Sequence, residues 1–426
     1  MDSIPKTSSP SAPEPFLDER VALRCVHCGL CLAVCPTYLE TGDENHSPRG
    51  RIYLMRRLQS GRAALDATTV QPVDTCLGCL ACQPACPAIV NYADLLDHTR
   101  QHIEHHHRRT LFEVFLRRWL IEMVFPHPWR MRLGLTAARL VRRLGLVKVL
   151  PGFMRKMVAM VPLEMNRQSI PIRSPTTASE TRGRVGFLTG CVQSVMFGGT
   201  NRTCVGLLNR AGYDVVTPTG QGCCGALYAH LGNLDEARAC ARRNIAAFEP
   251  LALDYVLTAG SGCGFALKEY GHLLRDDPAW AGRAAAFSSR VRELVELLPA
   301  SSSGSGPPRP LVTYHEACHL AHAQGIRQQP RAILKAVCGD RFVELPESDL
   351  CCGSAGSYNL TQPDMSDRLQ RRKVANILKT GASIVVTTNP GCLLQIRTGL
   401  AAAGRADIAV MHLADFLAMA QNGPTG

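Results

Sequence analysis

The stretch CVHCGLCLAVCP, residues 25–36, places four cysteines within eleven positions and a proline directly after the last one. The same spacing returns at residues 76–87 as CLGCLACQPACP. Because both copies read C-x-x-C-x-x-C-x-x-x-C-P, they predict two equivalent loops whose thiols converge in space. We therefore expect the first part of the chain to fold around its cysteines and not around a hydrophobic core alone.

These loops have the spacing of iron-sulfur ligands. C-x-x-C-x-x-C lets one loop supply three corners of a cluster, and the fourth cysteine, before the proline, ligates the other cluster in two-cluster ferredoxins. Two [4Fe-4S] clusters with crossed ligation are predicted, the first held by Cys25, Cys28, Cys31 and Cys86 and the second by Cys76, Cys79, Cys82 and Cys35. His27 is interpreted as a neighbour that tunes its cluster by hydrogen bonding. Zinc is the structural alternative, but zinc knuckles need neither the third cysteine step nor the trailing proline.

The composition is that of a folded protein of two or three domains, with 426 residues of which 46% are hydrophobic and 19% charged. The 19 cysteines occur in C-x-x-C runs and Cys-Cys pairs, which favours metal ligands in a reducing compartment over a disulfide framework. Residues 1–18 contain no apolar export segment and are predicted to be a disordered lead. Since no apolar run is long enough to span a bilayer, we expect a cytoplasmic location.

The net charge of +12 is concentrated in residues 99–167, which contain fourteen Lys and Arg against four Asp and Glu. Apolar residues recur there at helical spacing, so the segment is predicted to form amphipathic helices interrupted by prolines. Three interpretations remain open: solvated basic faces, a docking surface for an acidic partner subunit, or peripheral binding to anionic lipid on the cytoplasmic face of the inner membrane. Nucleic acid is not expected, because no nucleic-acid-binding motif accompanies the charge.

Two stretches rich in Pro, Ser, Thr and Gly are predicted to be linkers, residues 168–183 and 300–309. The predicted folded parts are a ferredoxin-like domain, the basic segment and two later domains, at residues 19–98, 99–167, 184–299 and 310–421. The two later domains repeat one cysteine pattern. The first contains Cys191, Cys223, Cys224 and Cys263, and the second contains Cys318, Cys351, Cys352 and Cys392.

Each repeat alternates short β-rich apolar runs with helical patterns, which predicts βαβ units and a parallel sheet. The expected fold class is α/β, with an α-helical N-terminal ferredoxin-like domain and two homologous parallel-sheet repeats. Cysteines follow the runs VGFL (185–188) and YVLT (255–258), and so fall at the carboxyl ends of strands, where open α/β sheets bind ligands. Cys204, Cys240 and Cys338 have no counterpart in the other repeat and are predicted to fill the core.

Each repeat resembles the cysteine-rich CCG domain of heterodisulfide reductases and related dehydrogenases, whose pattern is Cys, Cys-Cys and C-x-x-C. Here the last motif is GSGC (260–263) in the first repeat and NPGC (389–392) in the second, so its first cysteine is missing. The repeats are therefore candidates for a further cluster, for another metal, or for no metal. His315, His319 and His322 cluster around Cys318 in the sequence and keep a zinc or mixed-ligand site open for the second repeat.

The whole chain resembles the iron-sulfur subunits of glycolate oxidases, more properly glycolate dehydrogenases, through the strings CVHCG, GDENHSPRGRIYL, GCCGA, LCCGSAG and NPGC. The resemblance implies a hetero-oligomer in which FAD-containing subunits oxidise glycolate to glyoxylate, and a quinone or another membrane acceptor for the electrons. This chain itself has no Gly-rich dinucleotide fingerprint after a strand. We therefore expect no catalytic residue and no substrate site on it, and predict that it carries electrons.

Other complexes share these modules. The iron-sulfur subunits of anaerobic glycerol-3-phosphate dehydrogenase and of a lactate-utilisation complex are alternatives, and neighbouring genes for two FAD-linked oxidases would favour glycolate. A catalytic role of the repeats, as in heterodisulfide reduction, is a third hypothesis that the missing cysteines disfavour. A zinc-bound structural module is the fourth.

Overall fold

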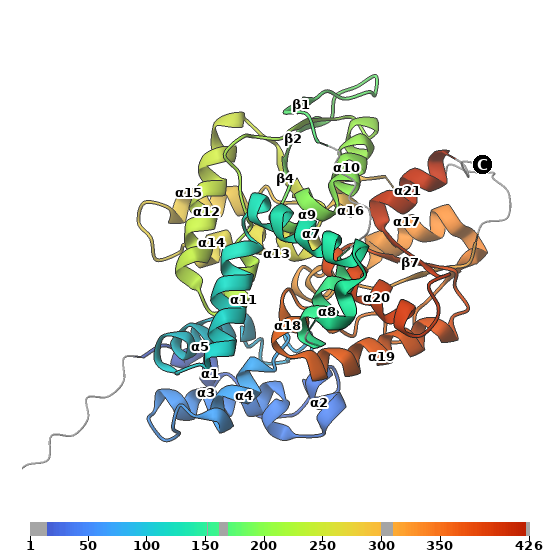
Figure 1. Ribbon diagram of the computed structural model, residues 1–426. Helices are drawn as coiled ribbons and strands as arrows, with labels where there is room; N and C mark the ends of the chain where they lie inside the picture. Colours follow the sequence, from blue (N-terminus) through green and yellow to red (C-terminus); the bar gives the residue numbers. More distant parts are fainter. Residues whose placement is uncertain (1–14, 151, 162–168, 300–309, 423–426) are drawn as a thin grey trace, which may run out of the picture.

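The computed structural model describes residues 15–150, 152–161, 169–299 and 310–422. These residues form a helical N-terminal part, a helical crossing segment and two α/β units, each with a four-stranded sheet (Figure 1). The predicted fold class is confirmed. The linker expected at residues 300–309 and most of the lead expected at residues 1–18 lie outside the described residues.

Phe16 and Leu17 pack against the N-terminal helices, although the sequence predicts disorder up to residue 18. Leu17 is buried, and its backbone N–H donates to Gln59 Oε1 over 2.6 Å. Asp18 is the N-cap of α1 (Glu19–Leu23), where its carboxylate accepts from the Arg20 N–H over 2.9 Å. The sequence pattern missed this packing because Leu17 is held by a residue far along the chain.

The N-terminal part consists of α1, α2 (Pro36–Thr41), η1 (Glu44–His46), α3 (Pro48–Gln59), α4 (Ala67–Asp74) and α5 (Tyr92–His106). Its longer helices begin at capping residues. Ser47 caps α3, Asp66 forms a capping box with Thr69 at α4, and Asn91 caps α5. These caps satisfy the first N–H groups of each helix. The helices pack around a core that includes Met55, Val73, Leu95 and Ile103, and the cysteine loops connect them.

The crossing segment follows as α6 (Leu111–Val114), the π-helix η2 (Phe115–Glu122), α7 (Pro128–Arg143), η3 (Leu146–Val149) and α8 (Gly152–Met160). Arg109 and Arg117 both pair with Asp74 and with Glu104. Two arginines of the segment that was predicted to form a basic surface are therefore largely buried in ion pairs. Among the described residues, helices are too short or too polar to pass through the hydrocarbon layer of a bilayer.

The first α/β unit has the strand order β1-β3-β2-β4, with β1 (Arg173–Ser174), β2 (Gly183–Leu188), β3 (Tyr213–Val216) and β4 (Tyr255–Thr258). Strands β3, β2 and β4 are parallel, as predicted, and β1 is antiparallel to β3. Strand β1 lies within the stretch predicted as a linker. The helices of the first unit are α9 (Cys191–Met196), α10 (Gly198–Arg210), α11 (Ala226–Leu231), α12 (Leu234–Phe248), η4 (Glu249–Leu251), α13 (Ser261–Lys268), α14 (Tyr270–Leu273), α15 (Ala281–Ser288) and α16 (Leu294–Leu297).

The second α/β unit has the order β6-β5-β7-β8, with all neighbours parallel. Its strands are β5 (Val312–Tyr314), β6 (Phe342–Val343), β7 (Ile384–Thr387) and β8 (Ala409–His412). Its helices are η5 (His319–Ala323), α17 (Gln328–Cys338), η6 (Gly339–Arg341), α18 (Tyr358–Thr361), α19 (Pro363–Lys379), α20 (Pro390–Ala402) and α21 (Leu413–Asn422). In the first unit, a parallel bridge between Val256 on β4 and Val291 takes the place that β8 has beside β7 in the second unit. The order of the parallel strands is therefore the same in both units.

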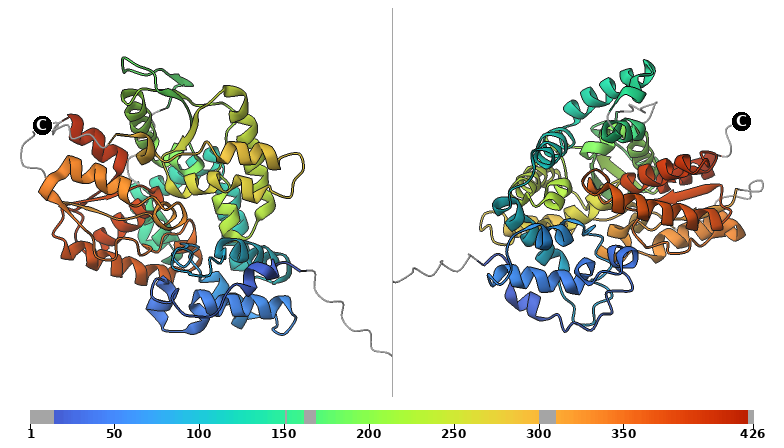
Figure 2. Two further views of the ribbon diagram at one scale, coloured as in Figure 1. Left: turned by 180° about the vertical axis from the view of Figure 1, so that it is seen from behind. Right: turned by 60° about the horizontal axis from the view of Figure 1, so that its bottom comes forward.

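The N-terminal part lies against both α/β units (Figure 2). Asp94 on α5 contacts the first unit, where its Oδ1 lies 2.7 Å from His272 Nε2. Glu40 on α2 contacts the second unit through an ion pair of 3.0 Å with Arg372. The cysteine loops are therefore held next to both repeats.

The two repeats also meet each other at the carboxyl ends of β4 and β7. The backbone N–H of Ser261 donates to Thr388 O over 3.3 Å, and the N–H of Gly262 donates to Asn389 Oδ1 over 3.3 Å. These bonds join the GSGC and NPGC motifs directly. The cysteines of all three parts thus converge on one region of the molecule.

Candidate redox centres

The two cysteine loops of the N-terminal part have the same backbone pattern. His27 and Gly29 in the first loop have φ values of 54° and 86°, and the corresponding Gly78 and Leu80 in the second have 61° and 59°. Left-handed residues on both sides of a cysteine curve the loop, so that its backbone N–H groups can face an enclosed anionic group. Two loops of equal spacing therefore also have equal conformation, which fits two clusters of the same kind.

The first predicted ligand set lies near the surface. Cys28 is exposed, and Cys25, Cys31 and Cys86 are partly buried. Burial is the main cause that raises the pKa of the Cys31 thiol, and the charge of Cys25 raises this pKa further. Cys25 and Cys31 are thus close enough to interact, as two ligands of one cluster would be.

The second predicted ligand set lies deeper. Cys35, Cys76 and Cys82 are buried, and Cys79 is partly buried. Burial raises the pKa of Cys79 and of Cys82 well above the usual value, and the charges of Cys35 and Cys76 raise both pKa values further. Cys35 therefore interacts with cysteines of the second loop, although it follows the first loop in sequence. This proximity supports the crossed ligation, which remains a prediction.

Arg51 on α3 brings a buried positive charge to the second set. Its Nη1 lies 3.9 Å from Cys35 Sγ, and its Nε donates to Pro72 O over 2.6 Å. Burial raises the pKa of Cys76, but the charges of Arg51 and Arg100 outweigh burial and hold this pKa below its usual value. The sequence analysis missed Arg51 because an arginine in an amphipathic helix is ordinarily solvated. The residues present therefore fit anionic iron-sulfur clusters.

The cysteines of the repeats lie at the carboxyl edges of the two sheets, as predicted. Cys191 begins α9 after β2, and Cys263 lies in α13 after β4. In the second repeat, Cys318 follows β5 and Cys392 lies in α20 after β7. The Cys-Cys pairs follow β3 and β6. All eight predicted repeat cysteines are thus brought to the ligand-binding edges of their sheets.

The backbone conformation and the close packing around each CCG motif require its glycine. Gly225 and Gly353 have φ values of 89° and 87°, which residues with a side chain rarely adopt. A Cβ at Gly225 would lie 3.1 Å from Ala237 O, and a Cβ at Gly353 would lie 2.7 Å from Ser366 O. Only glycine lets the backbone after each Cys-Cys pair approach α12 in the first repeat and α19 in the second this closely.

The thiols of the first repeat lie in a row. Cys191 Sγ is 3.5 Å from Cys223 Sγ, and Cys224 Sγ is 3.2 Å from Cys263 Sγ. Cys240, which was predicted to fill the core, packs in one buried cluster with Cys191 and Cys223 and raises the pKa of Cys223. It therefore adds a fifth thiol that sequence reasoning missed, since the second repeat has no cysteine at this position. Cys204 and Cys338 are buried in a hydrophobic core, as predicted.

The positions of the missing cysteines are filled in two different ways. A Cβ at Gly260 would lie 2.0 Å from Nε2 of Gln193, so the side chain of Gln193 takes the space of the missing cysteine in the first repeat. In the second repeat, Asn389 occupies the position, and its Nδ2 lies 3.6 Å from Cys392 Sγ. Asn389 thus contacts a remaining thiol, whereas Gln193 fills the space beside the backbone of Gly260.

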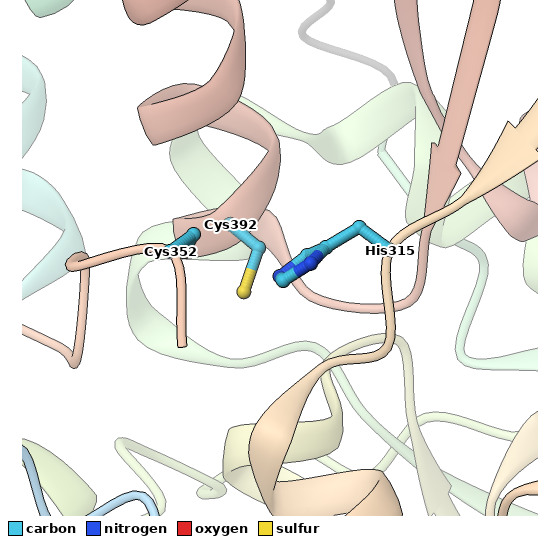
Figure 3. Close-up of side chains that lie close together, drawn as sticks. All are labelled: His315, Cys352 and Cys392. Atoms are coloured by element: carbon cyan, nitrogen blue, oxygen red, sulfur yellow. The ribbon is translucent and has the colours of Figure 1, made fainter. Parts of the chain in front are cut away.

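The second repeat combines its thiols with a histidine (Figure 3). His315, Cys352 and Cys392 each offer a ligand atom within 4.8 Å of the other two. Figure 3 shows the ring of His315 pointing from the loop after β5 towards the sulfur of Cys392. The other thiols continue this group, since Cys318 and Cys351 interact electrostatically with each other, and Cys351 does so with Cys352.

The other two candidate histidines bond elsewhere. His319 Nε2 lies 2.9 Å from Gly78 O, and His322 Nε2 lies 2.9 Å from Asp349 O. The spacing of the three histidines suggested that two of them share a helix face at the site. Within the described part of the chain, only His315 is brought into a three-ligand group with the thiols.

The second ligand set of the N-terminal part borders the second repeat. Cys79 interacts electrostatically with Cys318 and with Cys351. Tyr358 Oη donates to Thr75 O over 2.9 Å, which fixes the start of the second cysteine loop against α18. The thiols therefore continue from one domain into the next.

A cavity of about 100 Å³ lies where the N-terminal part meets both repeats, lined among others by Cys224, His230, His319 and Asp97. Burial lowers the pKa of His230 to about 3, so its ring is neutral at neutral pH. Burial raises the pKa of Asp97 to about 6. The junction between the three parts thus holds the neutral His230 beside charged groups, since Asp94 in the same lining pairs with Arg275.

Comparisons with known proteins agree with this division of the chain. Residues 21–90 match the family model of a 4Fe-4S dicluster domain, and residues 185–268 and 312–397 match that of a cysteine-rich domain. A solved structure, a hypothetical protein from Helicobacter pylori, superposes with a TM-score of 0.53 over 96% of this chain and 76% of that chain. At 9% sequence identity, this likeness concerns the fold alone.

Curated relatives match over nearly the full length. The chain is 39% identical over 418 residues to the probable glycolate oxidase iron-sulfur subunit of Bacillus subtilis (strain 168), covering 94% of both proteins. It is 36% identical over 391 residues to the glycolate oxidase iron-sulfur subunit of Escherichia coli (strain K12), covering 90% of this chain and 91% of that protein. Lactate utilization protein A of Bacillus subtilis is 31% identical but covers 55% of this chain.

Proposed function

Because the chain belongs to the family of glycolate oxidase iron-sulfur subunits, we propose that it conducts electrons from FAD-containing partner subunits to a quinone or another membrane acceptor. FAD on the partners supplies the chemistry that converts glycolate to glyoxylate, with release of two electrons and two protons. This chain receives the electrons one at a time. The observation that carries the proposal is the unbroken succession of thiols from the surface to the second repeat.

The burial of the cysteines supports a direction for electron flow. The first set contains the exposed Cys28, whereas three cysteines of the second set are buried. Beyond the second set, Cys79 interacts with Cys318 and Cys351 of the second repeat. Electrons therefore enter at the exposed first set and move inward to the second set and the repeats.

Exposed apolar side chains flank the first ligand set in the sequence. Val26 is 70% exposed and Ile89 is 76% exposed, and Leu23 and Leu30 are also exposed. These residues stand next to ligands of the first set in sequence. Since exposed apolar residues that are grouped together favour a protein interface, we assign this face to docking of a flavoprotein subunit. The exposed Cys28 would place the first ligand set on the side of the chain that receives electrons from the flavin of this partner.

The crossing segment presents a second apolar and basic face. Trp119 is 60% exposed and Trp129 is 64% exposed, and Leu133, Leu140 and Leu144 are exposed on α7 or next to it. Arginines and lysines occur between these residues. Aromatic and apolar side chains combined with basic ones are typical of helices that lie in the interface of an anionic bilayer. We assign this face to the cytoplasmic surface of the membrane that contains the acceptor.

The extent of the matches favours glycolate over lactate. The two glycolate oxidase relatives cover 90% or more of the chain, whereas lactate utilization protein A covers 55%.

The test is a substrate panel on the complex, co-purified with its flavoprotein subunits under anaerobic conditions. Glycolate should reduce an artificial dye at least tenfold faster than L-lactate or glycerol 3-phosphate at equal concentration. Faster reduction with either of the other two substrates would contradict the proposal.

A further inference from the structure

We propose that the second repeat binds a borderline divalent transition metal, zinc or ferrous iron, with His315, Cys352 and Cys392 as ligands. The proposal concerns a centre on this chain alone. It does not depend on which hydroxy acid the complex oxidises or on the two clusters of the N-terminal part.

The imidazole of His315 is the first argument. His315 is 1% exposed, and neither Nδ1 nor Nε2 has a hydrogen-bond partner among the described residues. A buried polar group without a partner costs about 1–3 kcal/mol. The backbone gives the residue a fixed place, because its N–H donates to Val386 O over 2.9 Å. A ring held in place with two unpaired nitrogens is suited to bind a metal ion.

The two thiols are the second argument. Cys352 and Cys392 are buried, and their sulfurs and a ring nitrogen of His315 lie within 4.8 Å of one another. Thiolate and imidazole together are the donor set of zinc and of other borderline metals. Cys351, which is buried and directly precedes Cys352 in the chain, is the candidate for a fourth ligand.

The charge around the site is the third argument. Lys373 on α19 is buried, and it interacts electrostatically with Cys351 and Cys352. Its ammonium group donates to the backbone carbonyls of Glu347 and Ser348, so it stays beside the thiols. A divalent metal with three thiolates and a neutral imidazole carries one excess negative charge, and a fixed cation at this place compensates it.

The first repeat lacks these features and serves as an internal comparison. The residue three positions before the first cysteine is His315 in the second repeat and Leu188 in the first. Leu188 is buried in an apolar cluster together with Cys224. Counted from the helix N-caps Asn233 and Gln362, the position of Lys373 is taken by Asn244. The imidazole and the ammonium group therefore occur together in the second repeat alone, although both repeats have the same four cysteines.

The experiment compares metal content in the full-length chain, purified under anaerobic conditions as wild type, His315→Leu, His315→Cys and His322→Gln. Iron, zinc and acid-labile sulfide are counted per chain. His315→Leu copies the first repeat, and His315→Cys keeps a soft donor. His322→Gln is the matched control, because His322 bonds with the Asp349 carbonyl and with Arg327.

We expect wild type and His322→Gln to contain zinc, or iron beyond the roughly eight ions of two [4Fe-4S] clusters. His315→Leu should lose this additional metal, His315→Cys should keep it, and the two clusters should remain in all four proteins. Zinc in the additional fraction identifies a zinc site, and iron in excess of sulfide identifies a ferrous site. Wild type without additional metal, or His315→Leu with the full amount, would overturn the proposal. Loss of the additional metal from both His315→Leu and His315→Cys would also overturn the proposal, because this result would show that His315 acts through packing and not as a ligand.

Discussion

Nη1 of Arg51 lies 3.9 Å from Sγ of Cys35, and both residues are buried. The guanidinium cannot turn away, because it also donates to Pro72 O over 2.6 Å and to Thr37 Oγ1 over 2.9 Å. A fixed cation beside cluster ligands stabilises negative charge, and a [4Fe-4S] cluster gains negative charge when it is reduced. The relationship therefore bears on the redox potential of the second cluster.

Replacing Arg51 by methionine should lower the midpoint potential of the second cluster. Methionine keeps the apolar part of the side chain but removes the charge. A loss of about 1.4 kcal/mol from the reduced state corresponds to a fall of about 60 mV for a one-electron couple. Redox titration followed by electron paramagnetic resonance measures both clusters. The control is Arg57→Met, since Arg57 contacts Tyr53 and the Arg62 carbonyl at the surface; equal shifts in both variants would contradict the role of Arg51.

Crossed ligation predicts that Cys35→Ser and Cys28→Ser damage different clusters. Cys35 interacts with Cys79 and Cys82, so its loss should first impair the cluster of the second loop. Cys28→Ser should impair the exposed first cluster and leave the buried one. Electron paramagnetic resonance of the reduced variants distinguishes the two signals. If Cys35→Ser damaged the same signal as Cys28→Ser, the ligand assignment would be wrong.

Asp74 should make the attachment of the crossing segment dependent on pH. Burial raises the pKa of Asp74, but its bond with Arg109 and the charge of Arg117 outweigh burial and hold this pKa below its usual value. A carboxylate with a lowered folded-state pKa stabilises fully above the ordinary Asp value of about 4 and loses this effect as pH falls through the folded-state pKa. Asp74→Asn should therefore lower the free energy of unfolding by about 3 kcal/mol at pH 7.

Urea unfolding between about pH 2 and pH 7 measures this effect, because the stabilisation is lost only as pH falls below the ordinary Asp pKa of about 4. Asp235→Asn is the matched control, because Asp235 pairs with Arg238 but its side chain is 72% exposed. The stability difference between wild type and Asp74→Asn should be constant near neutral pH and shrink towards acid. A difference below about 1 kcal/mol at pH 7, as expected for an exposed pair, would show that the network does not hold the segment.

Substitution of Trp119 and Trp129 by serine should weaken binding to anionic vesicles. Both indole rings are exposed on the crossing segment, where they can insert at the level of lipid headgroups. A loss of about 1.4 kcal/mol lowers affinity about tenfold. Co-sedimentation with phosphatidylglycerol vesicles measures it, and Trp280→Ser is the control, because Trp280 stacks with Arg283 away from this segment. If the wild type, the Trp119 and Trp129 variant and the control bound the vesicles equally, the exposed face of the crossing segment would be assigned to a protein partner.

The sequence predicted those features of the site that rest on regular spacing. Two equal cysteine loops, two parallel sheets and cysteines at their carboxyl edges all follow from repeated local patterns. Arg51 and Cys240, which were not predicted as site residues, show what such patterns lack, and the spacing of the three histidines near Cys318 could not single out His315. Arg51 is buried because residues from other helices satisfy its guanidinium, and Cys240 and His315 reach their sites only when the sheet and its helices are packed. The contact of Cys79 with the second repeat depends on how domains are placed, which no local spacing encodes.

Reduction of the clusters by glycolate in the intact complex tests the central claim most directly. The complex is purified with its flavoprotein subunits under anaerobic conditions, mixed with glycolate, frozen and examined by electron paramagnetic resonance. The account predicts signals of reduced [4Fe-4S] clusters that appear with glycolate, and it predicts that Cys28→Ser prevents reduction of the buried second cluster. Flavin reduction by glycolate with no cluster signal in the wild-type complex would contradict the claim that this chain conducts the electrons.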